Sequence, residues 1–503
     1  MKLFKNYQAL FWLSQGLLVL IKIAFTLRPE IDLFTEEAQY WLWSQNLAWH
    51  YYSKPPMVAV FNYLSTSLFG VSELSVRLVP ILFGLGSSWL IFQLAFLLVR
   101  SQKIAFWASL ILASMPFFLL FTTFHMTDSE LMFFWVLTWF FLAKALQSQE
   151  WKWWLFAGLA AAFGLASKPI MILVLPALGL YLLLKGQLKT FFSKGLVFTG
   201  VLLLGFLPSL IWNVQNDFQT FKHIATLGGV QGEEEATRSF LEVVIDFLTF
   251  VGSQLGIVSL FLLPLLWIGL KTKAIQRMPS VLLLTLPILV TLLLFGAMSL
   301  LTEVLANWPA FCYPPLAIVL AFVADQQSEK WRKVRNWGIA IGLGLPVLLL
   351  LPEAFGWKKA TRLELAEVAV FRRMTGYEDI AHRVEYLKDS LGVEQPFYFS
   401  ESYHVASELA FYLPDHPQPY QAEMGSRRNQ FDLWEGLENE VGRDKVGVFV
   451  SLHQDSPEAV TTFENLVYEE EFPIYFRDVF VRNAKIQFWS RLQSYDPVVI
   501  DSY

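Results

Sequence analysis

The chain has 503 residues and a formal net charge of −5 at pH 7; 55% of its residues are hydrophobic and only 16% are charged. Soluble domains of average composition carry about 25% charged residues. The composition therefore excludes a soluble globular protein and predicts that most of the chain lies in a lipid bilayer.

Eleven hydrophobic stretches qualify as candidate membrane helices, because about 20 apolar residues cross a hydrocarbon core about 30 Å thick. They are centred near residues 17, 89, 113, 138, 160, 177, 203, 258, 290, 313 and 344. The pair near 160 and 177 is separated only by Ser167-Lys168-Pro169. We expect an α-helical polytopic membrane domain over residues 1–352 with about eleven transmembrane helices.

The charges between these stretches predict the orientation, since Lys and Arg are retained on the cytoplasmic side. With the N-terminus inside, the cytoplasmic segments carry 16 Lys and Arg against 3 Asp and Glu. The opposite segments, up to the last stretch, hold 14 acidic and 6 basic residues. We therefore expect a cytoplasmic N-terminus and, with an odd number of spans, an extracytoplasmic C-terminal region.

The first outer loop, residues 28–77, opens with the adjacent carboxylates Glu36 and Glu37. They begin an amphipathic stretch, residues 36–47, that contains Tyr40, Trp41 and Trp43. Trp and Tyr prefer the depth of the lipid headgroups, so this pattern predicts a helix lying in the membrane interface. Such a helix would hold a carboxylate near the headgroups.

Lys54 follows the aromatic pair Tyr51-Tyr52 and precedes Pro55-Pro56 in the same loop. The two prolines remove backbone donors and restrain the turn. A rigidly placed ammonium group is suited to bind phosphate. The loop therefore combines carboxylates, aromatic residues and one candidate phosphate ligand.

Other predicted outer ends carry polar residues that have both a functional and a structural interpretation. Asp128 is a candidate site residue or a helix N-cap. Lys168 is a candidate ligand or a lysine that extends to the interface. Arg77 is a ligand or an interfacial anchor, and Asn307 with Trp308 forms a substrate contact or part of the aromatic belt.

From residue 353 to 503 the composition becomes more polar, and no further stretch of membrane length occurs. Residues 395–400, 445–451 and 474–489 have the pattern of strands, and residues 403–412 that of a short helix. We expect a water-exposed α/β domain that either binds an acceptor or closes over the site, or else only stabilises the membrane domain.

The sequence contains no Gly-rich phosphate loop, no Cys/His metal cluster and no Ser-His-Asp signature. No cofactor is indicated with certainty. A divalent cation is compatible with the extra carboxylate of Glu37, because hard cations take oxygen ligands. We expect no nucleic-acid partner.

Several motifs resemble, in the same order, segments of integral-membrane glycosyltransferases that use lipid-linked sugars. This group includes protein O-mannosyltransferases and aminoarabinose (lipid A) transferases, and it has the GT-C fold. The motifs are Tyr51-Tyr52-Ser53-Lys54-Pro55-Pro56, Ser75-Val76-Arg77-Leu78, Thr127-Asp128-Ser129, Ser167-Lys168, residues 207–213, Asn307-Trp308-Pro309-Ala310 and residues 411–414.

The resemblance implies transfer of a sugar from a polyprenyl-phosphate donor to a glycolipid, glycan or protein acceptor. The reaction would take place at the outer face of a bacterial cytoplasmic membrane, with inversion at the sugar. It requires a base for the acceptor hydroxyl and positive charge for the leaving phosphate. The implied roles are catalytic for Glu36 and Asp128, phosphate-binding for Lys54, Lys168 and Arg77, and substrate-binding for Glu37, Tyr40, Tyr51, Tyr52, Asn307 and Trp308.

One position departs from the family pattern, which reads Asp-Glu-Ala where this chain has Glu36-Glu37-Ala38. Glu has the same acid chemistry with one more methylene, so Asp32, four residues earlier, is an alternative base. A transporter or flippase for a lipid-linked sugar remains a second interpretation. An inactive assembly scaffold is a third.

Overall fold

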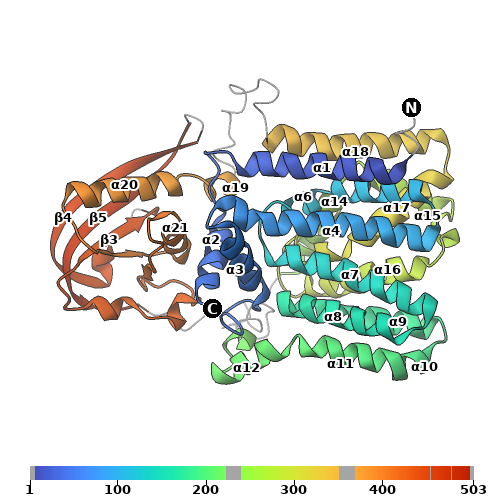
Figure 1. Ribbon diagram of the computed structural model, residues 1–503, viewed down its shortest axis with the longest axis horizontal. Helices are drawn as coiled ribbons and strands as arrows, with labels where there is room; N and C mark the ends of the chain where they lie inside the picture. The colour runs from blue at the N-terminus through green and yellow to red at the C-terminus, as the bar shows by residue number, and fades with distance from the viewer. Residues whose placement is uncertain (1–5, 223–238, 351–368, 454, 477–478, 499–503) are drawn as a thin grey trace.

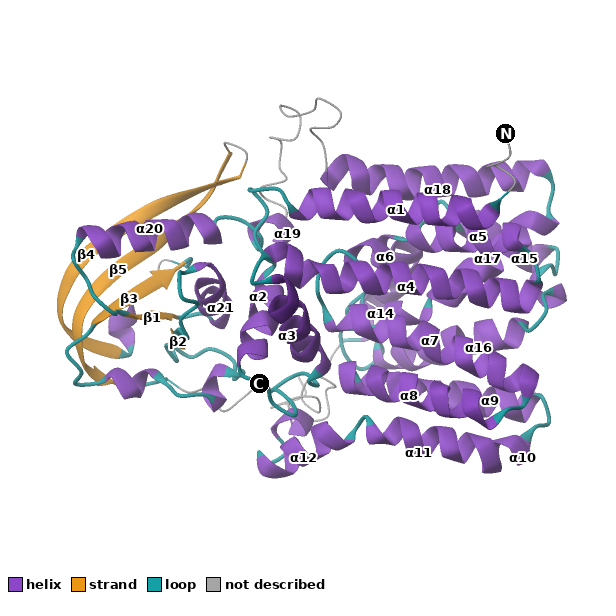
Figure 2. Ribbon diagram, in the orientation of Figure 1, coloured by secondary structure: helices purple, strands orange, loops and turns teal. Residues whose placement is uncertain are grey.

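The structure, a computed structural model, describes residues 6–222, 239–350, 369–453, 455–476 and 479–498. A bundle of helices forms the larger part, and an α/β unit packs against one of its ends (Figures 1 and 2). Two helices of the segment 28–77 lie between these parts. The predicted domain boundary between residues 352 and 353 lies outside the described residues.

Most helices belong to the bundle and to the segment that covers its end. They are α1 (Tyr7–Thr26), α2 (Thr35–Gln45), α3 (Met57–Phe69), α4 (Glu73–Val99), α5 (Gln102–Ala113), α6 (Pro116–Phe121), α7 (Thr127–Ser148), α8 (Trp151–Ser167), α9 (Val174–Leu184), α10 (Leu188–Thr190), α11 (Leu196–Leu204), α12 (Leu207–Gln215), α14 (Phe240–Val258), α15 (Leu263–Lys271), α16 (Val281–Met298), α17 (Pro314–Gln326) and α18 (Glu329–Leu350).

Five of the described helices, α1, α4, α7, α14 and α16, are long and apolar enough to cross a membrane. A sixth span results if the stretch Leu188–Leu204 and α12, which meet at 44°, are taken together. Ten of the predicted centres lie within helices, and the one near residue 313 lies at the start of α17. The multi-pass helical architecture is confirmed, whereas the count of eleven spans stays a prediction.

Breaks in the helices explain why fewer of them reach membrane length. Proline stands at the first or second position of α6, α12, α15 and α17, and of the short 3-10 helix Pro169–Leu173 that precedes α9. Proline fits the first turn of a helix but cannot continue a preceding one, because it lacks the N–H donor. The predicted pair near 160 and 177 is accordingly divided at Lys168-Pro169.

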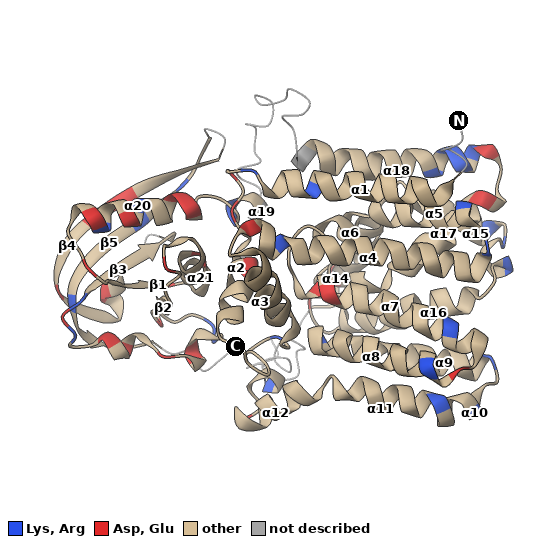
Figure 3. Ribbon diagram, in the orientation of Figure 1, with Lys and Arg blue, Asp and Glu red and all other residues tan. Residues whose placement is uncertain are grey.

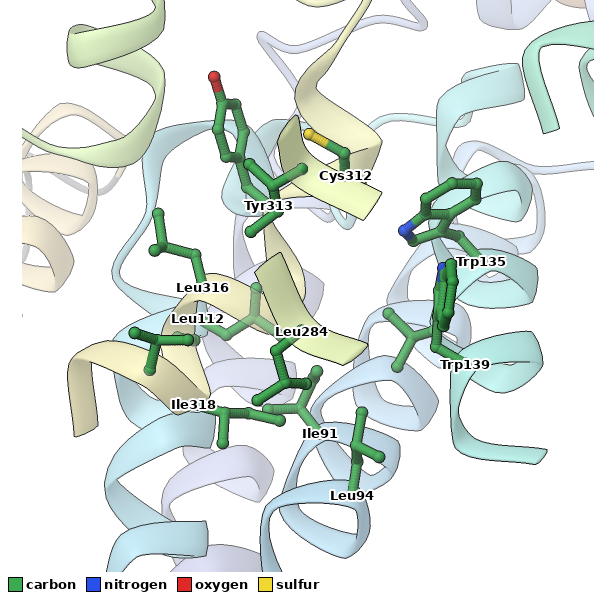
Figure 4. Close-up of a cluster of buried hydrophobic side chains, with 14 of the residues drawn as sticks. Ile91, Leu94, Leu112, Trp135, Trp139, Leu284, Cys312, Tyr313, Leu316 and Ile318 are labelled. Carbon is green, nitrogen blue, oxygen red and sulfur yellow. The ribbon is translucent and has the colours of Figure 1, made fainter. Parts of the chain in front are cut away.

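The centre of the bundle is a continuous apolar core. Figure 4 shows side chains gathered there from five helices: Ile91 and Leu94 of α4, Leu112 of α5, Trp135 and Trp139 of α7, Leu284 of α16, and Leu316 and Ile318 of α17. The ring of Trp135 meets that of Phe311 edge to face, with centroids 4.8 Å apart. Such packing fixes the ends of the helices that carry the polar residues.

The α/β unit contains α19 (Ala369–Arg372), α20 (Tyr377–Ser390), α21 (Tyr403–Tyr412) and a five-stranded sheet of order β2-β1-β3-β5-β4. Its strands are β1 (Phe397–Ser400), β2 (Tyr420–Gln421), β3 (Val446–Ser451), β4 (Thr461–Phe476) and β5 (Val479–Tyr495). β1 is parallel to β2 and β3, and the other pairs are antiparallel.

The predicted strands at 395–400 and 445–451 and the helix at 403–412 are confirmed by β1, β3 and α21. The predicted stretch 474–489 instead spans the end of β4 and much of β5. Its apolar pattern continues through a hairpin because both strands place residues against the same core. The predicted α/β unit is thus present, and its β4–β5 hairpin is longer than expected.

The prediction that residues 36–47 form a helix is confirmed by α2, while its placement in the membrane interface stays a prediction. Trp41 and Trp43 are 0% and 1% exposed, and Tyr40 is also buried. Trp41 packs edge to face on Phe411 of α21, with ring centroids 4.9 Å apart. The aromatic residues of α2 therefore pack against protein, where they join the α/β unit to the bundle.

Candidate active site

Four of the predicted charged residues converge from different elements at the end of the bundle that faces the α/β unit. Glu36 lies in the first turn of α2, Lys54 in the loop before α3, Asp128 in the first turn of α7 and Lys168 just after α8. Lys168 Nζ lies 2.7 Å from Asp128 Oδ1. Asp128 is not the N-cap of α7, which is Met126.

Lys54 is held by a compact turn. The backbone N–H of Tyr51 donates to the carbonyl of Lys54 at 3.0 Å. The ring of Tyr51 stacks on Trp43 at 4.6 Å, and its hydroxyl donates to the Trp43 carbonyl at 2.9 Å. Pro55 and Pro56 then lead directly into α3. The aromatic and proline residues thus fix the position from which the lysine extends.

The electrostatic surroundings of Lys54 connect it to the other three residues. Burial, and to a lesser degree the charge of Lys168, lowers the pKa of Lys54 to about 8, whereas Asp128 and Glu36 oppose the shift. No residue described in the structure forms an ion pair or hydrogen bond with the Lys54 ammonium. A half-buried cation without a partner is suited to receive an anion.

Glu36 contacts a residue that the sequence did not single out, Arg373 of the α/β unit. Arg373 Nη2 lies 2.6 Å from Glu36 Oε1. The hydroxyl of Thr35 donates to Glu36 Oε2 at 2.9 Å and accepts from Arg373 Nη2 at 2.7 Å. The α/β unit therefore helps to orient the candidate base. Arg373 is so far from Glu36 in the sequence that no local pattern predicts this contact.

Glu37 and Arg77 form a separate, fully buried ion pair. Arg77 Nη2 donates to Glu37 Oε2 at 2.9 Å, and both side chains are 0% exposed. Glu37 also accepts from the backbone N–H of Phe34 and of His125, at 2.9 and 2.8 Å. The pair therefore joins α2, α4 and the segment before α7. The substrate-binding role of Glu37 and the phosphate-binding role of Arg77 stay predictions.

Asp32, the alternative base, lies beside this pair. Its carboxylate accepts from the backbone N–H of Tyr377 at 2.6 Å. Burial is the main cause that raises the pKa of Asp32 to about 8, although the Tyr377 N–H opposes the shift. At neutral pH this carboxyl group holds its proton. A general base must be ionised, so this environment favours Glu36.

Two buried histidines complete the surroundings. His50 Nδ1 lies 2.8 Å from Ser209 Oγ in α12, and burial, with Lys54, lowers the pKa of His50 to about 3. His125 Nε2 lies 2.7 Å from Glu130 Oε1. Both histidines lie next to motifs from which the site was predicted, although the sequence did not indicate either of them as a site residue. The first loop is thereby tied to α12 by an uncharged imidazole.

The predicted substrate-binding residues divide into two groups. Tyr40 is close enough to Glu36 and Asp128 for their charges to raise the pKa of its hydroxyl, after the larger effect of burial. Tyr51 and Tyr52 are buried in the Lys54 loop. Trp308 instead packs against Phe295, with ring centroids 6.2 Å apart, next to the half-buried Asn307. The structure records no contact between the described Asn307 or Trp308 and the four charged residues.

The possible divalent cation has no evident ligand set in the described part of the chain. No group of three or more His, Cys, Asp or Glu side chains is arranged there to hold a metal ion. Glu37, the carboxylate considered for this role, is instead engaged by Arg77.

Comparisons with known proteins agree with the predicted resemblance. Residues 53–212 match the family model described as dolichyl-phosphate-mannose-protein mannosyltransferase. The lipid A galacturonosyltransferase RgtD of Rhizobium johnstonii is 24% identical over 413 residues, which cover 79% of this chain and 82% of RgtD.

Two solved structures have the same fold over nearly the whole chain. ArnT from Cupriavidus metallidurans in the apo state has a TM-score of 0.64 at 16% identity, covering 95% of this chain and 97% of that protein. The same enzyme bound to undecaprenyl phosphate has a TM-score of 0.65 at 17% identity, covering 96% and 98%. The resemblance to lipid-linked-sugar-dependent glycosyltransferases of the GT-C fold is therefore confirmed.

Replacing Arg77 separates a structural from a ligand-binding role. Arg77→Met leaves Glu37 buried without its cation, which should cost about 3–5 kcal/mol of stability. The variant Glu37→Gln/Arg77→Met should lose less stability than the two single changes added together. Thermal unfolding in detergent measures the stability of the single variants and of the double variant. Unchanged unfolding together with weakened donor binding would instead assign Arg77 to the phosphate.

Asp32→Asn should keep transferase activity, because an amide preserves the acceptor for Tyr377 N–H. Between pH about 4 and 8, unfolded Asp32 is ionised whereas folded Asp32 holds its proton. Wild-type stability therefore falls as pH rises through this window. The variant should gain stability relative to wild type from pH 5 to 8.5 in thermal unfolding. Loss of activity with intact folding would make Asp32 the base.

Proposed function

We propose that this chain is a glycosyltransferase that moves a sugar from a polyprenyl-phosphate donor to a glycolipid acceptor, lipid A in particular, during modification of the cell envelope. The observation that carries the proposal is the convergence of Glu36, Lys54, Asp128 and Lys168 at one end of a GT-C bundle. RgtD, named as a lipid A galacturonosyltransferase, and ArnT bound to undecaprenyl phosphate support the acceptor and the carrier.

The proposed reaction is a single displacement with inversion at the sugar. The acceptor hydroxyl oxygen forms a bond to the anomeric carbon while the bond from that carbon to the phosphate oxygen breaks. The hydroxyl proton passes to Glu36, and polyprenyl phosphate leaves with the bonding electron pair. RgtD makes polyprenyl-phosphate galacturonic acid the first donor to test.

Lys54 and Lys168 are the proposed ligands of the donor phosphate. Lys54 carries no counter-ion among the described residues, so its charge is available to the leaving group. Lys168 is oriented by Asp128 at 2.7 Å. Preorganised positive charge in a site of low dielectric stabilises a developing anion more than the same charge does in water.

Asp128 then has two proposed functions: it orients the acceptor or serves as a second base, and it positions Lys168. Tyr40, Tyr51 and Tyr52 are proposed to bind substrate from α2 and the Lys54 loop. Glu37, Asn307 and Trp308 are further candidates for substrate binding, and Arg77 is a third candidate phosphate ligand. The buried Glu37–Arg77 pair supports an indirect contribution, through the placement of α2.

We further propose eleven spans in the bacterial inner membrane, with the N-terminus in the cytoplasm and the α/β unit outside. Figure 3 supports this orientation, because Lys and Arg gather at the end of the bundle that lies opposite the α/β unit. Cytoplasmic ends of membrane helices carry an excess of Lys and Arg. The candidate site then faces the outer leaflet.

Glu36→Gln tests the proposed base. The amide cannot accept the acceptor proton, so turnover should fall by about 100-fold or more, while the protein still inserts and folds. Release of polyprenyl phosphate from a synthetic donor measures turnover. Glu30→Gln is the matched control, because Glu30 is a nearby exposed carboxylate paired with Arg28 at 3.4 Å. Full activity of Glu36→Gln would exclude Glu36 as the base.

Lys54 variants test the phosphate ligand. Lys54→Ala should weaken donor binding most, measured as a rise in KM for the donor. Because the pKa of Lys54 in the protein without bound donor is about 8, the ammonium loses its charge above this pH. Donor affinity should therefore fall as pH rises through that value. Lys54→Arg should keep its charge and move this loss to higher pH. A change confined to the KM of the acceptor would contradict the assignment.

A further inference from the structure

A groove of about 690 Å³ lies on the bundle outside the candidate active site. One wall consists of Leu260 and Phe261, in the turn before α15, and the other of Trp337 and Ile341 of α18. Lys330 and Lys333, together with one carboxylate, Glu329, lie on the same wall at the N-terminal end of α18. The groove therefore has an apolar length and a basic end.

The floor of the groove is a close contact between α18 and the turn before α15. A Cβ added to Gly338 would lie 2.8 Å from Leu262 Cδ2 and 3.1 Å from the Phe261 carbonyl oxygen. Only glycine allows this approach without a shift of the neighbouring turn. The groove is thus a formed surface depression with a fixed floor.

The walls are apolar and open to the surroundings of the bundle. Trp337 is 69% exposed, Leu260 59% and Phe261 46%. From Lys330 to Ile341, α18 rises about 16 Å at 1.5 Å per residue. This length suits the upper part of an acyl chain. In a multi-pass membrane protein the natural occupant of such a surface is a lipid.

The charges of α18 are divided between two faces. Arg335 packs on the bundle, with its guanidinium carbon 3.5 Å from the centre of the Trp107 ring. Lys333 lies 3.3 Å from Glu329, but both side chains are at least 70% exposed, so the pair is weak. No carboxylate in the described part of the chain pairs with Lys330. The basic end thus has a charge left for an anionic headgroup.

We propose that this groove binds an anionic glycerophospholipid. The lipid phosphate lies against Lys330 and Lys333, and one acyl chain runs along Leu260, Phe261 and Trp337. Basic pockets between membrane helices bind anionic headgroups in this way, and each lysine contributes about fivefold in affinity. The site lies at the end of the bundle opposite the candidate active site and is independent of glycosyl transfer.

The test uses the purified full-length protein in neutral detergent and fluorescent phosphatidylglycerol as the probe. Unlabelled phosphatidylglycerol should compete about 25-fold better than phosphatidylcholine, from two lysines at about fivefold each. Lys330→Ala/Lys333→Ala should remove this preference, and added salt should weaken it. Lys185→Ala/Lys189→Ala, which removes two exposed lysines elsewhere on the bundle, should leave it unchanged.

A second variant tests the apolar wall. Trp337→Ala should weaken the binding of both phospholipids without changing their ratio, since it removes contact with the acyl chain and leaves the lysines intact. Equal competition by the two phospholipids, or an unchanged preference in Lys330→Ala/Lys333→Ala, would overturn the proposal. Stronger competition by polyprenyl phosphate that depends on the same lysines would assign the groove to the sugar carrier instead.

Discussion

The candidate active site depends on the buried ion pair between Glu37 and Arg77. It fixes α2 against α4, and its carboxylate also accepts the backbone N–H of His125, three residues before Asp128. Because Glu36 directly precedes Glu37 on the helix, fixing one sets the direction of the other. Arg77 Nη2 also donates to the Asp32 carbonyl at 2.6 Å, and removal of either partner would leave an uncompensated buried charge. The pair therefore gives the site a single geometry.

The α/β unit is part of this geometry. The backbone N–H of Asp32 donates to the Met374 carbonyl at 2.9 Å, and its carboxylate accepts from Tyr377 N–H. Arg373 then reaches Glu36, and Phe411 covers Trp41. These contacts support a role of the unit at the site, as in the predicted acceptor-binding or closing function, together with the stabilising role considered from the sequence.

The cations of the chain differ in function according to whether they have a partner. Arg77 is neutralised by Glu37 and Lys168 is oriented by Asp128. Lys54 and Lys330 have no carboxylate partner among the described residues. Lys54 precedes α3, next to the α/β unit, whereas Lys330 lies in the first turn of α18, at the other end of the bundle. Both are proposed to meet phosphate. The first would hold it during turnover, and the second would bind a lipid of the other leaflet.

The sequence by itself determined the membrane class, the helical stretches and the motifs that contain Glu36, Lys54, Asp128 and Lys168, because hydrophobic length and turn chemistry are local properties. It also located β1, β3 and α21, whose apolar patterns are short and uninterrupted.

Only the tertiary structure decided which charges meet. Arg373 lies 337 residues after Glu36, and nothing local distinguishes a lysine paired with Asp128 from one left unpaired. The burial of α2 also followed from packing, since the sequence pattern of an aromatic helix is the same whether lipid or protein covers it. Pairing, burial and the resulting pKa of Lys54 are properties of distant segments brought together, which a local pattern does not contain.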